Sequence, residues 1–213
     1  MVNKSQLNLL LELAKQCSEC AKKHFYSENS NEFSLKEDNS PLTKADLEVS
    51  KMAVNGLKKI FPNDTIVSEE TYSNKFKPLN KRFWLIDPID GTKEFINGNI
   101  NFTINFALIF LNKSIFGLIV QPCTDNVWYS FNSKSWKIEN SYNFLDSSEI
   151  KTSTFSPKNI KLIASKNHSD SELEHWINII EPKSKINIGS SLKFCKIAEG
   201  KADIYPRNNP TME

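Results

Sequence analysis

The chain has 213 residues, of which 39% are hydrophobic and 24% charged, proportions typical of a globular protein with a sizeable core. Its 27 basic and 25 acidic side chains give a net charge of +2, which does not favour binding to a nucleic-acid polymer. The longest apolar run is only strand-sized, and Glu12 interrupts the apolar residues near the N-terminus. We therefore expect a cytoplasmic protein without a membrane span; the sequence does not indicate its oligomeric state.

Helical and extended patterns alternate in the first part of the chain. Apolar residues at helical spacing predict a helix over Leu7–Phe25. Thr43, with Asp46 three residues later, is typical of a helix start, and this second helix is expected to end near Ile60. Apolar runs then predict two short strands and an antiparallel meander, at 65–68, 82–86, 101–111, 115–121, 127–131 and around 136–138.

The second part of the chain has the same mixed character. Residues 141–158 are polar and rich in Ser and Thr, so we interpret them as the join between two halves. The patterns after them predict alternating strands and helices, at 161–165, 171–180, 185–188, 191–199 and 202–205. The sequence therefore predicts a mixed α/β chain in two packed halves, residues 1–140 and 141–213.

Two of the four cysteines, Cys17 and Cys20, form a C-x-x-C pair. Such a pair can hold zinc or take part in redox chemistry, but this one falls within the first predicted helix and has no second pair to accompany it. The pattern favours four reduced thiols packed as small hydrophobic side chains, with a zinc or redox site as the alternative. The sequence gives no role to His24 or His175.

Two pairs of acidic residues follow two of the predicted strands. Glu69 and Glu70 come directly after the first short strand, while Asp87 and Asp90 follow the second. If these strands are neighbours, the four carboxylates converge at one edge of the sheet, where ligand sites of α/β proteins lie. Converging carboxylates share protons or bind a cation, and oxygen donors without His or Cys suit Mg²⁺, Mn²⁺ or Ca²⁺.

The turn that contains the two aspartates has features of a phosphate site. Pro88 fixes the backbone, Gly91 permits a tight turn, and a helix starting near Thr92 would present the amides of Gly91 and Thr92 to a phosphate. The Thr92 hydroxyl would then reach an attacking water. Asp-Pro-x-Asp-Gly also occurs as a simple polar turn, and this alternative stays open for the segment taken alone.

The whole segment Asp87–Phe95, Asp-Pro-Ile-Asp-Gly-Thr-Lys-Glu-Phe, resembles the signature of the inositol monophosphatase superfamily. Its Lys-Glu-Phe ending is typical of the CysQ branch. Three further stretches resemble the same family in the same order, at 38–46, 67–70 and 189–207. The resemblance therefore spans nearly the whole chain.

This resemblance implies a layered α/β fold of the sugar-phosphatase type and a Mg²⁺-dependent hydrolase. The implied substrate is a small phosphorylated nucleotide, 3′-phosphoadenosine 5′-phosphate, whose 3′-phosphate is removed to give AMP and phosphate. Two or three Mg²⁺ ions would stabilise the attacking and leaving oxygens. The implied metal ligands are Glu69, Asp87, the carbonyl of Ile89 and Asp90, and Glu70 would support them.

The same resemblance implies further roles. Asp46 and Thr92 would form the hydrogen-bonded pair that orients and deprotonates the attacking water. The residues implied on the nucleotide side are His168, Ser190, Lys193 and Arg207. Lys193 and Arg207 also fit solvated surface charges, and His168 also fits an exposed loop histidine, so these alternatives stay open.

The chain departs from the family pattern at its C-terminal end. In the family, the segment at 209–213 leads into a Trp-Asp-x-Ala-Ala-Gly motif whose Asp binds the second metal, and that motif is absent here. We therefore expect a truncated C-terminal half and an under-coordinated second metal. Two alternatives to an active nucleotidase remain: an inositol or sugar phosphatase of the same superfamily, and a non-catalytic remnant that binds metal or nucleotide.

Overall fold

The structure, a computed structural model, describes residues 2–36, 39–71, 81–154, 156–165 and 171–207. The chain forms two compact units, residues 1–149 and 150–213, and each has its own cluster of buried apolar side chains. The division falls at β9 (Ser148–Ile150), which adds the last strand to the sheet of the first unit. This division lies within residues 141–158, the polar segment that the sequence indicates as the join, and the first unit extends nine residues beyond the expected boundary at 140.

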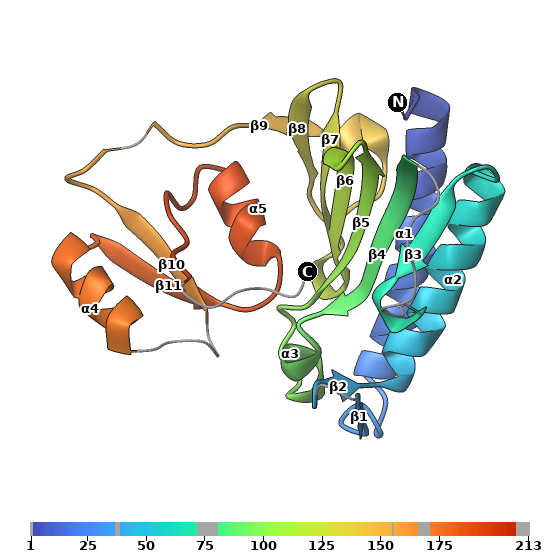
Figure 1. Ribbon diagram of the computed structural model, residues 1–213, viewed down its shortest axis with the longest axis horizontal. Coiled ribbons are helices and arrows are strands. Elements are labelled where there is room, and N and C mark those ends of the chain that lie inside the picture. The colour runs from blue at the N-terminus through green and yellow to red at the C-terminus, as the bar shows by residue number, and fades with distance from the viewer. Residues whose placement is uncertain (1, 37–38, 72–80, 155, 166–170, 208–213) are drawn as a thin grey trace. The chain divides into compact units, whose positions relative to one another are not determined.

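Among the described residues, the first unit contains two long helices and a seven-stranded sheet (Figure 1). The helices are α1 (Lys4–Phe25) and α2 (Lys44–Ile60). A short helix, α3 (Thr92–Ile96), comes between two strands of the sheet in the order of the chain. In spatial order the strands are β3 (Thr65–Ser68), β4 (Arg82–Asp90), β5 (Thr103–Phe110), β6 (Lys113–Gln121), β7 (Asn126–Phe131), β8 (Lys134–Ile138) and β9. The smaller elements are the paired strands β1 (Ser34–Leu35) and β2 (Pro41–Leu42), and the 3-10 turns η1 (Glu69–Thr71), η2 (Pro122–Thr124) and η3 (Phe144–Asp146).

Strand pairing in the large sheet is parallel at one edge and antiparallel elsewhere. β3 pairs in parallel with β4, whereas β4 through β8 follow one another as an antiparallel meander. From Ile104 onward every second side chain of β5 is buried, namely Ile104, Phe106 and Leu108. This alternation is the pattern of a strand with one face in the core, and the predicted meander is confirmed.

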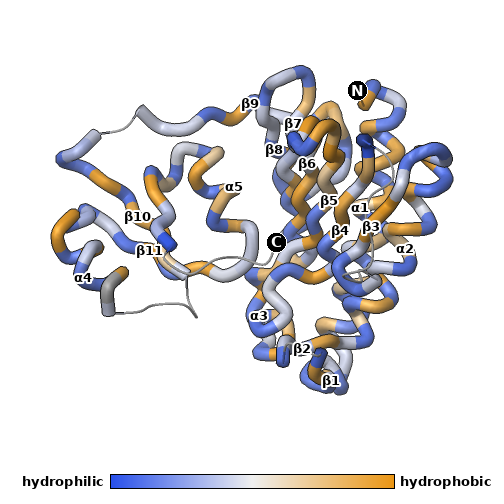
Figure 2. The backbone as a smooth tube through the Cα atoms, in the orientation of Figure 1, coloured by the Kyte–Doolittle hydropathy of each residue, from blue (hydrophilic) through white to orange (hydrophobic). Residues whose placement is uncertain are grey.

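The helices α1 and α2 pack as an antiparallel pair against one face of the sheet (Figure 1). Their approach is close, because a Cβ atom placed on Gly56 of α2 would lie 2.3 Å from Leu13 Cδ1 of α1. Figure 2 shows hydrophobic and hydrophilic residues alternating along both helices, as expected for amphipathic helices that cover a sheet. Both predicted helices are confirmed, and Thr43 caps α2 in a reciprocal capping box with Asp46.

The second unit is a smaller α/β arrangement. Its strands β10 (Lys161–Ser165) and β11 (Ser184–Ile188) pair in parallel, with α4 (Ser171–Ile180) between them in the chain and α5 (Leu192–Ala198) after them. Buried Leu162 and Ala164 of β10 pack against Leu173 and Ile177 of α4. The predicted order of strand, helix and strand is thus observed, and a helix between two strands allows them to pair in parallel.

The strand expected at 202–205 does not form, and that prediction is wrong. Ile204 makes only an isolated parallel bridge with Leu162. The Asp203 side chain turns back to accept a hydrogen bond from the Lys161 amide at 2.8 Å. Two residues beyond the bridge, Pro206 has no N–H with which to continue a ladder, so the pairing ends after one residue.

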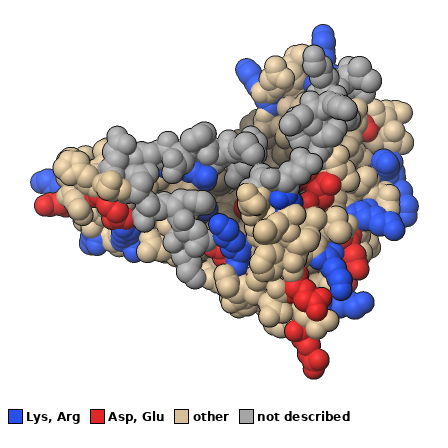
Figure 3. All heavy atoms as spheres, turned by 60° about the horizontal axis from the view of Figure 1, so that its bottom comes forward, with Lys and Arg blue, Asp and Glu red and all other residues tan. Residues whose placement is uncertain are grey.

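Charged side chains of both signs are distributed over the molecule. On the face drawn in Figure 3, the described Lys and Arg side chains are interspersed with Asp and Glu, in keeping with the near balance of charges in the sequence. No helix within the described ranges is long and apolar enough to cross a membrane. The cytoplasmic location expected from the sequence stays a prediction.

A partly buried polar contact holds the start of β3 against β4. Asp64, in the loop before β3, accepts hydrogen bonds through Oδ2 from Trp84 Nε1 at 3.1 Å and from Arg82 Nε at 3.0 Å. Trp84 is fully buried, and its ring centroid lies 4.8 Å from that of Phe61. A buried indole N–H needs an acceptor, so this contact fixes the loop that leads into β3.

We expect Asp64→Ala to lower the free energy of unfolding by about 1–3 kcal/mol, because it leaves the buried Trp84 N–H without its acceptor. Urea unfolding followed by circular dichroism measures this change. Asp64→Asn keeps an acceptor oxygen and is expected to cost less. A loss no larger than that of Glu32→Ala, which removes an exposed carboxylate paired with Lys44, would contradict the role given to Asp64.

Candidate active site

The two acidic pairs lie at one edge of the large sheet. β3 and β4 run in parallel, and Ser68 at the end of β3 is opposite Ile86 of β4. Glu69 follows Ser68 and Asp87 follows Ile86 in the sequence. These two acidic residues therefore each come directly after a residue of the same strand pair, at the same position along the two strands. The expectation that these strands are neighbours is confirmed. β4 continues to Asp90, beyond the predicted end at residue 86, so Asp87 and Asp90 lie in its last part and not after it. All four acidic residues are at the carboxyl ends of the two strands, where α/β proteins bind ligands.

A bulge in β4 places Asp87 and Asp90 on one face of the sheet. Residues three apart in a regular strand point to opposite faces, but the register between β4 and β5 shifts between these two aspartates. Asn105 of β5 lies opposite Asp87, so their side chains share a face. Asn105 Nδ2 donates to Asp90 Oδ2 at 3.3 Å, and Thr103 Oγ1 donates to the same oxygen at 3.4 Å. The Asp90 carboxylate is therefore held on the face that Asp87 occupies.

Lys36 connects the two glutamates. Its Nζ donates to Glu69 Oε1 and to Glu70 Oε1, each at 2.8 Å. Burial opposes the charged form of Lys36, but the hydrogen bonds to both glutamates outweigh this effect and raise its pKa. Burial raises the pKa of Glu70, whose side chain is 4% exposed, and the bond from Lys36 counters that shift. The Lys36 ammonium therefore balances the negative charge of the buried Glu70 and that of the exposed Glu69 at the same time.

Asp46 and Thr92 lie on nearby elements but bond to other partners. Asp46 is buried in the first turn of α2, and its Oδ2 accepts from Thr43 N at 2.8 Å and from Thr43 Oγ1 at 2.5 Å. Burial raises the pKa of Asp46, and the bonds from Thr43 and the charge of Lys36 counter this. Thr92 Oγ1 donates to the Ile89 carbonyl at 3.1 Å, and α3 contacts β2, which directly precedes Thr43. The predicted Asp46–Thr92 pair stays a prediction that requires the Thr92 hydroxyl to turn.

Gly91 starts α3 with a backbone φ of 94°. This left-handed conformation strains any residue with a Cβ, which explains the glycine between Asp90 and Thr92. The helix expected near Thr92 is confirmed, although it has only five residues. The phosphate-binding role of the Gly91 and Thr92 amides stays a prediction.

The residues expected on the nucleotide side belong to the second unit. Ser190, which is buried, adopts a positive φ of 53° just before α5. Lys193 is also buried, and its Nζ lies 5.4 Å from the centroid of the Tyr205 ring. This cation–π contact favours a held ammonium over the solvated charge that was the alternative. Arg207 is partly exposed, and His168 lies outside the described residues.

Sequence reasoning missed three residues of this site. Lys36 lies in a charged stretch typical of a solvated loop, and only the tertiary structure brings it to Glu69 and Glu70. Thr103 and Asn105 did offer a signal, because they are polar residues at alternate positions of an otherwise apolar strand. Alternate positions share a face, so these two could have been expected to meet polar groups there.

The chain matches the model of the inositol monophosphatase family over residues 3–213. It belongs to the inositol monophosphatase family. It is 33% identical over 206 residues to the 3′(2′),5′-bisphosphate nucleotidase CysQ of Salmonella typhimurium, covering 96% of this chain and 81% of that relative. Identity to the CysQ nucleotidase of Escherichia coli is 37% over 177 residues, 83% of this chain and 70% of the relative.

The fold of the family is also seen in solved structures. The crystal structure of CysQ from Bacteroides thetaiotaomicron matches this chain with a TM-score of 0.79 and 28% identity, over 99% of this chain and 82% of that one. An IMPase from Thermotoga maritima has a TM-score of 0.75 at 22% identity, which shows a shared fold. The predicted layered α/β class is confirmed by these matches.

Enzymes of the inositol monophosphatase family are metal-dependent phosphatases, typically with Mg²⁺. The donors at the acidic edge fit this ion, because Glu69, Asp87 and Asp90 offer carboxylate oxygens and Ile89 a carbonyl, without nitrogen or sulfur. Two acidic residues here, Glu69 and Glu70, bind one positive charge, the Lys36 ammonium. The residues present therefore suit a hard divalent cation.

The acidic side chains are spaced more widely than the ligands of one tight site. Within the ranges that the structure describes, the one trio of potential ligand atoms all within 4.8 Å of one another comprises Cys20, His24 and Glu48. Carboxylates repel one another, and Lys36 draws Glu69 toward itself. A Mg²⁺ ion bound by these acidic residues would therefore require their side chains to move closer together.

We expect Lys36→Met to strengthen Mg²⁺ binding, with an apparent Kd about tenfold lower, because the ammonium no longer competes with the ion for two glutamates. Isothermal titration calorimetry measures the change. Lys44→Met is the matched control, since Lys44 is an exposed lysine that pairs with Glu32 at 3.5 Å. Unchanged or weaker Mg²⁺ binding by the Lys36 variant would contradict the competition.

Proposed function

We propose that this protein is a Mg²⁺-dependent phosphomonoester hydrolase that removes the 3′-phosphate of 3′-phosphoadenosine 5′-phosphate and releases AMP and phosphate. The observation that carries this proposal is the parallel register of β3 with β4, which brings two acidic pairs to one edge of the sheet. The relatives at 33% and 37% identity are 3′(2′),5′-bisphosphate nucleotidases, which favours a nucleotide over an inositol or sugar phosphate.

We assign Mg²⁺ binding to Glu69, Asp87, the Ile89 carbonyl and Asp90, with Glu70 in support; two or three ions fit the family resemblance. Bound Mg²⁺ would neutralise the phosphate and make the attacking water more acidic. The chain itself prepares the site, because the hydrogen bonds from β5 hold the Asp90 carboxylate in place before any ligand arrives. Such outer partners commonly contribute 10- to 100-fold in affinity or activity.

Asp46 and Thr92 are our candidates for handling the water. Asp46 is held by Thr43 in a capping box at the start of α2, so its carboxylate has a fixed position from which to accept a proton. The Thr92 hydroxyl, now on the Ile89 carbonyl, would turn to orient the water. The amides of Gly91 and Thr92 would hold the phosphate from the side of α3.

The 5′-phosphate is the feature that separates the nucleotide from other phosphomonoesters. We assign it to Ser190, Lys193 and Arg207 of the second unit, and His168 to the adenine. The stacking of Lys193 Nζ on the Tyr205 ring keeps the ammonium in one place, which lowers the entropy lost when an anion binds. An inositol monophosphate has no second phosphate to use these residues.

We expect Asp90→Asn to reduce Mg²⁺-dependent phosphate release from 3′-phosphoadenosine 5′-phosphate by more than about 100-fold, because it removes a charged ligand from the ion. Glu70→Gln is expected to reduce it by roughly 10- to 100-fold, as for a residue that supports the ligands. Malachite-green detection of phosphate over a Mg²⁺ series measures both, with inositol 1-phosphate assayed beside the nucleotide.

Asp146→Asn is the matched control, because Asp146 is an exposed aspartate. The substitution makes the same chemical change away from the proposed site. It is expected to keep full activity. Full activity in Asp90→Asn would refute the metal assignment. Faster turnover of inositol 1-phosphate than of the nucleotide would refute the substrate, and circular dichroism of each variant verifies that it is folded.

A second prediction concerns the 5′-phosphate. We expect Lys193→Met to raise KM for 3′-phosphoadenosine 5′-phosphate by roughly 10- to 100-fold, since a charge-assisted hydrogen bond is lost, with little change in kcat. KM for adenosine 3′-monophosphate, which lacks the 5′-phosphate, should not change. Lys201→Met removes a more exposed lysine of the same unit and serves as control. Equal effects on both substrates would assign Lys193 a structural role.

A further inference from the structure

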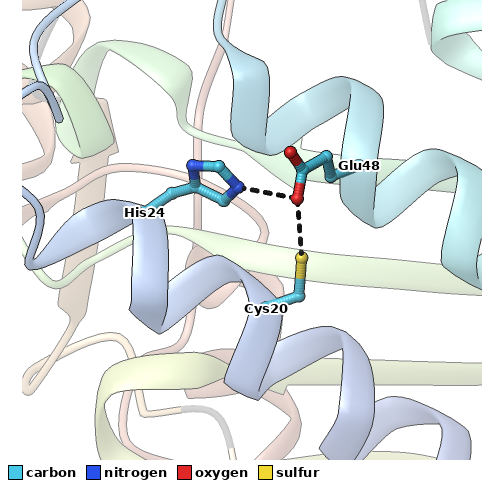
Figure 4. Close-up of side chains that lie close together, drawn as sticks. All are labelled: Cys20, His24 and Glu48. Carbon is cyan, nitrogen blue, oxygen red and sulfur yellow. Dashed lines mark hydrogen bonds and ion pairs between the residues drawn. The ribbon is translucent and has the colours of Figure 1, made fainter.

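A second group of potential metal ligands lies between α1 and α2. Cys20 and His24 are four residues apart on α1, so they project from one side of that helix, and Glu48 faces them from α2 (Figure 4). His24 Nε2 lies 3.0 Å from Glu48 Oε2, and Cys20 Sγ lies 3.9 Å from the same oxygen. The three ligand atoms all lie within 4.8 Å of one another. A thiol, an imidazole and a carboxylate thus meet at one point.

These distances nearly match those of a bound metal. Tetrahedral zinc sites have bonds of about 2.0–2.1 Å to nitrogen and oxygen and about 2.3 Å to sulfur, which puts the ligand atoms about 3.3–3.6 Å apart. Compared with that spacing, His24 and Glu48 must separate by about 0.3 Å, and the sulfur must approach each partner by no more than about 1.3 Å. Shifts of this size would have to come from rotation about side-chain bonds.

We propose that Cys20, His24 and Glu48 bind a borderline divalent metal ion of the Zn²⁺ class, with water as the fourth ligand. Mixed sulfur, nitrogen and oxygen donors select such an ion over Mg²⁺, so this site differs in chemistry from the acidic edge of the sheet. Binding exchanges the proton of the Cys20 thiol for the metal and releases that proton to water. The Glu48 side chain is 59% exposed, whereas His24 Nε2 is buried, so an ion would enter from the side of Glu48.

The proposed site uses only Cys20, whereas the C-x-x-C motif alone suggests that both cysteines bind a metal. All four cysteines are free thiols, and Cys17 is fully buried in the core. Burial first, then the neighbouring Cys20, raises the pKa of Cys17 to about 12, so it stays a protonated packing residue. Cys20 is the cysteine of the pair that meets α2, and its partners are His24, one turn later on α1, and Glu48 on α2.

The plain alternative is a His24–Glu48 ion pair that bridges two helices. An ion pair does not require a thiol, so the role of Cys20 separates the two explanations. A bound metal would cross-link α1 to α2 just after the turn that carries Asp46, and would stabilise the helical layer by binding only the folded chain. This effect requires no change at the acidic edge.

The test is a titration of the whole 213-residue protein with Co²⁺, in excess Mg²⁺ to occupy the carboxylate edge and with a thiol-free reductant. We expect one equivalent of Co²⁺ to produce the near-ultraviolet sulfur-to-cobalt charge-transfer band and tetrahedral visible bands. Cys20→Ser should abolish the charge-transfer band. His24→Gln and Glu48→Gln, which keep the thiol, should each raise the Kd for Co²⁺ at least tenfold.

The matched controls are Cys123→Ser, a partly exposed cysteine outside the trio, and His175→Gln, an exposed histidine on α4. Both should titrate like the unchanged protein. The proposal is overturned if no charge-transfer band forms, if the band persists in Cys20→Ser, or if it is lost in Cys123→Ser. Should Cys20→Ser not fold, an unchanged Kd in His24→Gln would overturn it equally. Because the readout is binding in excess Mg²⁺, it does not depend on phosphatase activity.

Discussion

Two short strands that run in the same direction determine where the acidic residues of this protein lie. Because β3 and β4 are parallel, the chain leaves both at the same edge of the sheet; an antiparallel pair would have put Glu69 and Asp87 at opposite ends. β3 has only four residues, so its register needs outside support. The hydrogen bonds that Trp84 and Arg82 donate to Asp64 give that support, so the position of the acidic residues depends on a partly buried contact near the start of β3.

Collecting acidic groups at one edge is unfavourable in itself, and the fold offsets this with a lysine from a distant loop. The ammonium of Lys36 bonds to both Glu69 and Glu70, so a Mg²⁺ ion at the site we propose would compete with it for these side chains. The proposed site of Cys20, His24 and Glu48 would select a different class of cation, because sulfur and nitrogen donors discriminate against hard ions. If both proposed sites bind metal, one small unit would keep two kinds of cation apart by donor chemistry.

Local signals allowed much of the fold to be predicted from the sequence. The reciprocal capping of Thr43 and Asp46, the alternation along β5 and the turn at Gly91 each depend on residues a few positions apart. Features that depend on distant parts of the chain could not be predicted. Lys36 reaches its partners only through the tertiary fold. The segment at 202–205 has the pattern of a strand, but Pro206 directly after it has no N–H with which to continue the ladder. For the site, the acidic pairs were found, while the side chains that hold them were not.

The division of the chain into two units also has a consequence for the order in which the protein matures. The residues that we assign to Mg²⁺ and to the attacking water all precede residue 93, and the first unit ends at residue 149. Its meander joins strands that are adjacent in sequence, and such contacts form early as a chain emerges from the ribosome. Ser190, Lys193 and Arg207 are synthesised later. A nascent chain would thus acquire its affinity for the cation before it can recognise a nucleotide, and cellular Mg²⁺ would favour the folded first unit while the second is still being made.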